Sequence, residues 1–330
     1  MLTGSRGDAM KIMVFDKSAK KIMQDLKLEE VAPYINNQQY LIWVDIENPS
    51  REIMQFLLDD FKFHPLDIED CLSVIERPKL DEYDDYMFLV MHIPFFIKQT
   101  RKLVPFTVNI FIGRNYLVTV HQGLCKPIQN TWANIVEKHS TLTVGSGYLL
   151  HRIIDALIDY SFPILNKIYR NIQNVEDEIF KKVSNKNVRD ILRIRTNILT
   201  FRNIIFPQRK LLKTLEIKDM EFLIDELEVY FSDLVDHIEK IWDTLENYKE
   251  LIEGIHEAHQ SLLSNKINDI MRILTIFSVV ILPLTFITGL YGMNVSLPLE
   301  NNAFAFIIII SFLALLALGM FMYFKHKEWL

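Results

Sequence analysis

Two long apolar segments near the C-terminus restrict the folds that this chain can adopt. No charged residue occurs from Ile273 to Leu290, and none occurs from Ala303 to Phe324. A helix rises about 1.5 Å per residue, so roughly 20 residues cross the ~30 Å hydrocarbon core of a bilayer. We therefore predict two transmembrane helices, at residues 271–291 and 303–324, joined by a connection at residues 292–302. The alternative is a pair of buried helices in a soluble domain, which the all-round apolar character of the second segment disfavours.

Basic residues flank the two apolar segments on one side only. Lys266 and Arg272 precede the first segment, Lys325 and Lys327 follow the second, and the connection contains no Lys or Arg. The positive-inside rule then places both termini in the cytoplasm and the connection outside. We expect a multi-pass protein of the cell (inner) membrane, with a basic cytoplasmic tail at residues 325–330.

The part of the chain before the apolar segments is long enough for one or two folded domains. Residues 1–125 alternate β-rich stretches with helical ones, which predicts an N-terminal cytoplasmic α/β domain. Residues 126–270 have few Gly and Pro and show helical spacing, which predicts a helical region and stalk. We expect helices at Ser146–Val183 and Asn187–Thr214, and a third that runs unbroken from Met220 into the membrane over more than 50 residues. A broken pair of helices is the alternative for the third.

Composition excludes several classes of function. The formal net charge of −6 argues against a nucleic-acid partner and leaves cations as candidate ligands. The two cysteines, Cys71 and Cys125, are not spaced as a metal or redox pair. The α/β region contains no Gly-rich phosphate loop and no nucleophile motif, so we do not expect an enzyme or an organic cofactor.

The first apolar segment has a polar face that a simple membrane anchor would not need. Two transmembrane helices leave no lumen between them, so a channel built from this chain must be an oligomer. Polar and small side chains alternate with apolar ones along one face, as in a pore with polar layers and hydrophobic constrictions. Alternatively, the hydroxyls on this face only bond to backbone carbonyls. Counted at helical spacing, the face comprises Asn268, Met271, Leu274, Ser278, Leu282, Thr285 and Gly289.

The tetrapeptide Tyr291-Gly292-Met293-Asn294, at the end of the first apolar segment, resembles the signature of the CorA family of magnesium transporters. The stretch Ser264–Asn294 and the ending Tyr323–Leu330 are also similar to that family. Further similar segments are His64–Leu72, Arg77–Lys79 and Tyr230–His237, so the resemblance covers nearly the whole chain. The loop Leu297-Pro298-Leu299-Glu300 departs from the family pattern, because its acid is displaced by one position relative to the proline.

The resemblance implies a funnel-shaped homopentamer that conducts Mg²⁺, with Co²⁺ and Ni²⁺ as further candidate ions. The absence of a visible nucleotide-binding motif predicts passive flux driven by the membrane potential. Asn294, with Gly292 and Met293, would form the outer selectivity ring, where neutral amide oxygens recognise a hydrated ion. Asn268, Met271 and Leu274 would form an inner neck, and Thr285 a polar ring in the middle of the pore. We expect the chain to leave the helix at Gly292 in a backbone conformation that a Cβ atom disfavours, which would explain why this position is a glycine.

The resemblance also implies regulation by cytosolic Mg²⁺. The carboxylates Glu69, Asp70 and Asp233 match family positions that bind divalent cations between neighbouring subunits, and Asp155 and Asp159 share a helix face that could join them. Carboxylates that face one another repel unless a cation neutralises them, so bound Mg²⁺ would hold the subunits together and close the pore. The alternative for each acid is a solvated surface position. Two other functions remain open: a zinc transporter of the same superfamily, and a membrane-anchored helical scaffold.

Overall fold

The computed structural model describes residues 9–24, 26–35, 37–73, 77–137, 145–181, 184–217, 228–293, 298, 304–327 and 329. The chain divides into two compact units, the first comprising residues 1–180 with 184–254 and the second comprising residues 181–183 with 255–330. The first unit contains the α/β domain and the helices that pack together behind it, and the second contains the two apolar segments.

A mixed seven-stranded sheet forms the centre of the first unit, in the order β2-β1-β3-β7-β6-β5-β4. All neighbouring strands are antiparallel except β3 and β7, which pair in parallel from Ile42↔Tyr116 to Glu47↔His121. The turn at Gly113–Asn115 joins the antiparallel strands β6 and β7. The strands are β1 (Ala9–Asp16), β2 (Lys21–Gln24), β3 (Tyr40–Glu47), β4 (Lys79–Glu82), β5 (Tyr86–Ile97), β6 (Lys102–Gly113) and β7 (Tyr116–His121).

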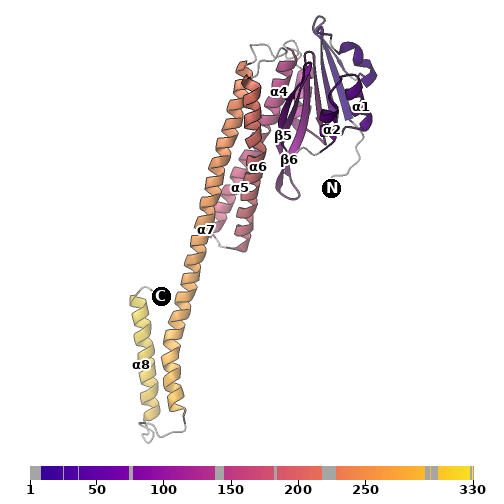
Figure 1. Cartoon of the computed structure of the whole chain (residues 1–330). Coiled ribbons are helices and arrows are strands. Elements are labelled where there is room, and N and C mark those ends of the chain that lie inside the picture. The colour runs from indigo at the N-terminus through magenta and orange to yellow at the C-terminus, as the bar shows by residue number, and fades with distance from the viewer. Residues whose placement is uncertain are drawn as a thin grey trace. The chain divides into compact units, whose positions relative to one another are not determined.

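Helices cover both faces of this sheet, as Figure 1 shows. On one face lie α1 (Arg51–Asp59) and α2 (Pro65–Leu72), over a core that includes Ile42, Val44 and Ile46 from alternate positions of β3. The opposite face carries Trp43, whose ring lies 4.8 Å from that of Trp132 in α3 (Lys126–Glu137). Burial on both faces explains why the strands are almost continuously apolar. Two short 3-10 turns, η1 (Leu28–Glu30) and η2 (Ala32–Tyr34), precede β3.

The predicted helix Ser146–Val183 is wrong as a single element. The structure has α4 (Ser146–Asp159) and α5 (Ser161–Lys181), which separate at Tyr160. Pro163 gives the reason: it has no N–H to bond the carbonyl of Asp159, and its ring would collide with that carbonyl in a continuous helix. Residues 182 and 183 lie outside the described part of the chain.

The helix α6 (Asn185–Ile217) extends beyond its predicted limits at both ends, and ion pairs and ring contacts tie its middle to the next helix. Arg209 Nη2 lies 2.5 Å and Lys213 Nζ 2.9 Å from Glu239, and Arg202 pairs with Glu246. The guanidinium carbons of Arg202 and Arg209 also lie 5.0 and 4.7 Å, respectively, from the centre of the Trp242 ring. These contacts hold α6 against the early turns of α7.

The prediction of one helix longer than 50 residues is confirmed by α7 (Glu228–Tyr291), which has 64 residues. Its expected start at Met220 lies outside the described residues. The alternative of a broken pair is wrong over the described range. Pro283 lies inside this helix and leaves the carbonyl of Val279 without its intrahelical donor. The last helix is α8 (Ala305–His326).

We predict that Asn115→Ala destabilises the first unit by about 1–3 kcal/mol, because the hydrogen bonds from the buried Asn115 amide to backbone carbonyls are lost. The Asn115 side-chain amide donates to the carbonyls of Tyr34 at 2.9 Å and Asn37 at 3.0 Å, next to the sheet. Thermal unfolding followed by circular dichroism would measure the loss. Asn203→Ala, at an exposed position of α6, is the control and should leave the midpoint within about 1 °C. Equal midpoints for the two variants would contradict the prediction.

Candidate ion pathway and acidic cluster

Two helices of the chain are long and apolar enough to cross a membrane. The apolar windows, in the helix Glu228–Tyr291 and at Phe306–His326, have mean hydropathies of 2.3 and 2.6. Only 6% and 0% of the residues in these windows are buried within the chain. A single chain therefore leaves this apolar surface uncovered, and a bilayer or other subunits must cover it.

The described positions of the predicted pore face all lie on α7 and are exposed in the single chain. They are Asn268, Met271, Leu274, Ser278, Leu282, Thr285 and Gly289. Tyr291 is the last residue of α7, and Gly292 and Met293 follow it, also exposed. Asn294, the predicted selectivity residue, lies outside the described residues. The assignment of these positions to a pore therefore stays a prediction.

The hydroxyls of α7 donate to the backbone of the preceding turn. Ser278 Oγ donates to the Leu274 carbonyl at 2.9 Å, and Thr285 Oγ1 to the Ile281 carbonyl at 2.9 Å. This is the backbone bonding that the alternative interpretation expected. It also fixes the hydroxyl proton, so the oxygen presents its remaining lone pairs as acceptors. Water molecules around a cation are donors, so the two interpretations are compatible.

Gly292 terminates α7 for a reason that differs from the predicted one. Its backbone is not in the left-handed region that favours glycine. Instead, its N–H donates to the Thr288 carbonyl at 3.0 Å, and a Cβ built on it would lie 3.3 Å from that same oxygen. The constraint is thus close approach to a carbonyl, and a methyl group at this position would crowd the last turn.

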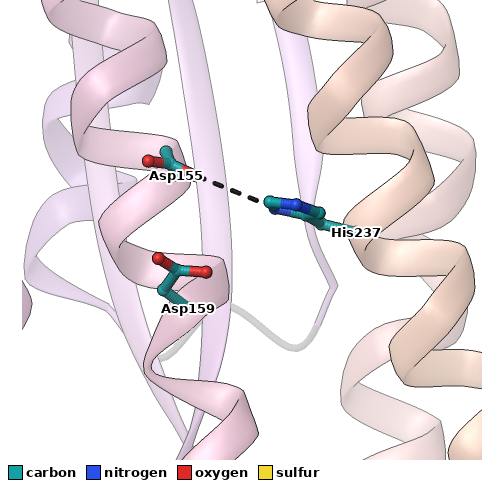
Figure 2. A group of neighbouring side chains, drawn as sticks. All are labelled: Asp155, Asp159 and His237. Atoms are coloured by element: carbon teal, nitrogen blue, oxygen red, sulfur yellow. Dashed lines mark ion pairs between the residues drawn. The ribbon is translucent and has the colours of Figure 1, made fainter.

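A second group of functional side chains lies where α4 faces the start of α7, as Figure 2 shows. Asp155 and Asp159 project from α4 and His237 from α7, and their ligand atoms all lie within 4.8 Å of one another. His237 Nδ1 is 3.8 Å from Asp155 Oδ1, and His237 Nε2 is 3.7 Å from Asp233 Oδ1. We call Asp155, Asp159, Asp233 and His237 the acidic cluster.

The electrostatics of the acidic cluster favour a cation. Burial raises the pKa of Asp155, against the opposing effect of Arg152, whose Nη1 lies 3.8 Å away. Burial and the neighbouring charge of Asp155 raise the pKa of Asp159. His237 Nδ1 is buried and has no hydrogen-bond partner among the described residues. The donor set of carboxylate oxygens and an imidazole nitrogen can hold a divalent metal ion.

The negative charge near the acidic cluster continues along the start of α7. Asp233 also lines a surface pocket with Glu216, Glu228 and Asp236. Four carboxylates on one pocket attract cations and repel anions.

Glu69 and Asp70 lie elsewhere, on α2, and do not join the acidic cluster in the single chain. The His64 ring accepts from the Leu66 N–H at 3.2 Å and caps this helix, with Pro65 at its first position. Asp70 Oδ2 is 2.6 Å from Lys79 Nζ, while Glu69 is exposed. Burial lowers the pKa of Lys79, but its hydrogen bonds to Asp70 and Asp81 outweigh that effect and raise it. The Asp70 charge is therefore already compensated within its own chain.

The sequence prediction of the acidic cluster missed His237. The available signal was its spacing, because His237 follows Asp233 by four residues and so shares its helix face. The prediction did include the three carboxylates, and the structure brings all of them near this histidine.

An α/β domain, a 64-residue helix that ends in an apolar segment, and a second apolar helix define a membrane protein with a candidate cation site. The family model of the CorA-like Mg²⁺ transporter protein matches residues 38–326. A putative metal ion transporter of Bacillus subtilis, YfjQ, is 34% identical over 87% of this chain and 89% of its own. The cobalt/magnesium transport protein CorA of Thermotoga maritima is 29% identical over 99% and 95%.

The chain belongs to the CorA-like Mg²⁺ transporter family and is a divalent-cation transporter. Its fold agrees with that of the complete CorA magnesium transporter structure from Methanocaldococcus jannaschii, with a TM-score of 0.85 over 97% of this chain and 98% of that one, at 24% identity. The zinc alternative rests on a more distant relative, the zinc transport protein ZntB of Yersinia pseudotuberculosis, which is 22% identical over 77% of each chain.

We predict that Asp155→Asn/Asp159→Asn stabilises the metal-free protein at neutral pH. The pKa values of both acids are raised in the folded state, so ionisation costs folding free energy as the pH rises above the ordinary carboxylate range. Both side chains are partly exposed, so screening limits the gain to several tenths of a kcal/mol, or roughly 1–2 °C.

The measurement is the thermal unfolding midpoint in excess chelator, at pH 7 and near pH 4. The gain should shrink at the lower pH, where the wild-type acids become protonated. Asp177→Asn, at an exposed position of α5, is the control. A double variant that is less stable than wild type at pH 7 in chelator would contradict the prediction.

Proposed function

We propose that this chain assembles into a homopentameric channel through which Mg²⁺ crosses the inner membrane passively, driven by the membrane potential and closed by cytosolic Mg²⁺. The observation that carries the proposal is the exposed face of α7, which alternates polar and apolar side chains and leads into the Gly292-Met293-Asn294 signature. Both termini would be cytoplasmic, and the connection at residues 292–302 would lie outside.

Oligomerisation follows from what one chain leaves uncovered. The pore-face residues Ser278 and Thr285 are exposed within the apolar segment, and polar groups facing lipid are costly. Several copies arranged around an axis turn these residues away from lipid and toward water. The family membership supports an oligomeric assembly, and the pentamer is the state that we propose.

Selectivity in this proposal comes from neutral oxygens. Mg²⁺ gives up its water molecules reluctantly, so a pore that binds the hydrated ion does not have to strip it. The Asn294 amide at the entrance and the Thr285 hydroxyl further along would accept from those water molecules. Thr285 is suited to this because its proton already bonds to the Ile281 carbonyl.

Regulation in this proposal uses the acidic cluster. Asp155, Asp159 and Asp233 would hold the regulatory cation together with His237, and the metal would supply the positive charge that offsets their repulsion. Glu69 and Asp70 would contribute from a neighbouring subunit, where Asp70 must exchange its pairing with Lys79 for the metal. A ring nitrogen is a better ligand for Co²⁺, Ni²⁺ or Zn²⁺ than for Mg²⁺, so His237 broadens the range of metals that can close the channel.

A membrane-anchored scaffold would also need a long helix and two apolar segments. It would not need a polar face on α7 or an imidazole beside two carboxylates. We therefore retain the channel as the function.

We predict that divalent uptake into vesicles containing the purified protein follows an imposed potential and needs no ATP. A potential of 100 mV is worth about 2.3 kcal/mol per charge, hence about twice that for a divalent ion, enough for more than a thousandfold accumulation. The measurement is Mg²⁺-dye fluorescence at several potassium diffusion potentials. Uptake that ignores the potential and requires ATP would contradict the passive mechanism.

The same assay tests the signature. Asn294→Ala should reduce the uptake rate at least tenfold without changing the oligomeric mass, because the amide is expected to contact the hydrated ion and no core. Asn302→Ala, in the same connection but outside the signature, is the control. Near-normal uptake by a correctly assembled Asn294→Ala variant would show that the signature asparagine does not select the ion.

We predict that Asp155→Asn/Asp233→Asn shifts the Mg²⁺ dependence of protease protection at least tenfold toward higher concentration. Each lost ligand worth ~1.4 kcal/mol moves a binding midpoint tenfold. The measurement is the fraction of intact chain after limited proteolysis across a Mg²⁺ titration and a parallel Co²⁺ titration. His237→Gln should shift the Co²⁺ midpoint more than the Mg²⁺ midpoint.

The control is Asp243→Asn, at an exposed position of α7 two turns beyond Asp236. If the protection midpoints of wild type and double variant coincide for both metals, the acidic cluster does not bind the regulatory cation.

A further inference from the structure

A basic pocket lies on the first unit, apart from the acidic cluster and the pore helix. It has a volume of about 320 Å³, at the small end of the range for small-molecule sites. Its lining brings together the tip of the β5–β6 hairpin and the helices α5 and α6, and includes Lys98, Arg101, Lys167, Arg193, Asn171 and Phe96. No carboxylate lines it among the described residues, although the chain as a whole is acidic.

Defined contacts hold two cations of this pocket, Lys167 and Arg193, and the backbone of the turn that carries Arg101. Asn197 of α6 is buried, accepts from the Leu103 N–H at 3.1 Å, and donates to the Arg101 carbonyl at 3.1 Å. These two hydrogen bonds fix the β5–β6 hairpin to α6. Figure 1 shows these elements next to one another. The ammonium group of Lys167 lies 3.5 Å from the centre of the Phe96 ring. Arg193 is steadied by Asp190, at 2.6 Å.

Arg101 adopts a backbone conformation that arginine disfavours. Its φ of 54° lies in the left-handed region, where glycine or asparagine is the usual residue of a tight turn. A non-glycine residue in this region raises the free energy of the folded chain. Like charges around the pocket have a further cost: burial, together with Lys98, Arg101 and Arg170, lowers the pKa of Lys167.

We propose that this pocket binds a small phosphate-bearing anion of several negative charges, such as a polyphosphate or a nucleoside triphosphate. Guanidinium groups bind phosphate oxygens in a bidentate manner, and the ammonium groups of Lys98 and Lys167 add point charges. The Asn171 amide supplies a neutral donor to the same space. The anion relieves the repulsion among the cations and fixes the hairpin tip on α5 and α6.

The test is equilibrium binding of sodium triphosphate and of ATP to the full-length protein in detergent, by calorimetry in metal-free buffer, so that chelation of Mg²⁺ plays no part. The variant is Arg101→Gly/Lys167→Gln, which removes two charges and gives the turn the residue that its backbone favours. We expect its Kd to rise at least tenfold. Raising the salt concentration should weaken wild-type binding more steeply than binding by the variant.

The matched control is Lys20→Gly/Lys210→Gln. Lys20 also has a left-handed φ, of 51°, in another turn, and Lys210 is an exposed lysine of α6, so the control has the same net charge and the same kinds of substitution. Its Kd should equal that of wild type. Equal weakening in both double variants would show only a general charge effect and would overturn the site.

Two further arms identify the source of the phosphate. Glycerol phosphate, a soluble mimic of a lipid headgroup, should bind more weakly than triphosphate, and tighter binding of it would overturn the polyphosphate assignment. No binding of any of these anions to wild type at millimolar concentration would overturn the proposal. Lys98→Gln, at an exposed hairpin position, keeps the test decisive if the double variant fails to fold, because it alone should raise the triphosphate Kd several-fold.

Discussion

The constraint on which the rest of this structure depends is the apolar surface at the C-terminal end of α7, which the chain cannot bury by itself. Hydrocarbon requires every backbone group to bond within the segment, and α7 meets this requirement except where Pro283 removes one donor. The same surface carries the hydroxyl groups of Ser278 and Thr285, which are less favourable in hydrocarbon than apolar side chains. In the proposed assembly, a bilayer on one side and further copies of α7 on the other would satisfy both demands, so membrane insertion and assembly would follow from one helix face.

The acidic cluster, in the water-exposed part of the protein, likewise contains groups whose interactions the single chain leaves unsatisfied. Two aspartates and a histidine approach one another without a hydrogen bond to the buried Nδ1 of His237, and burial raises the pKa of both aspartates. The folded chain thus holds charge that favours either protons or a cation. A site that is unfavourable when empty is suited to sensing, because its occupancy changes the stability of the contact between α4 and α7.

Much of the fold was predictable, because it depends on patterns that local physics fixes. The apolar segments, the 64-residue helix and the β6–β7 turn follow from periodicity, length and turn residues. The break between α4 and α5 was missed because the apolar spacing continues through it, although Pro163 was a visible signal. His237 and the pairing of Asp70 with Lys79 were missed because each depends on which elements face one another in three dimensions. The backbone of Gly292 shows a further limit, because glycine serves close approach as well as positive φ, and sequence does not distinguish the two.

The break at Pro163 has an electrostatic consequence for the acidic cluster. Because residue 163 is proline, the Asp159 carbonyl at the end of α4 lacks the N–H donor that a continuous helix would supply, so it keeps unused acceptor capacity next to the two carboxylates. Asp155 and Asp159 therefore stand in the last turn of a helix, where a carboxylate is unfavourable and a cation is favoured. One proline, which coordinates nothing, thus adds to the attraction that a cation experiences at this site.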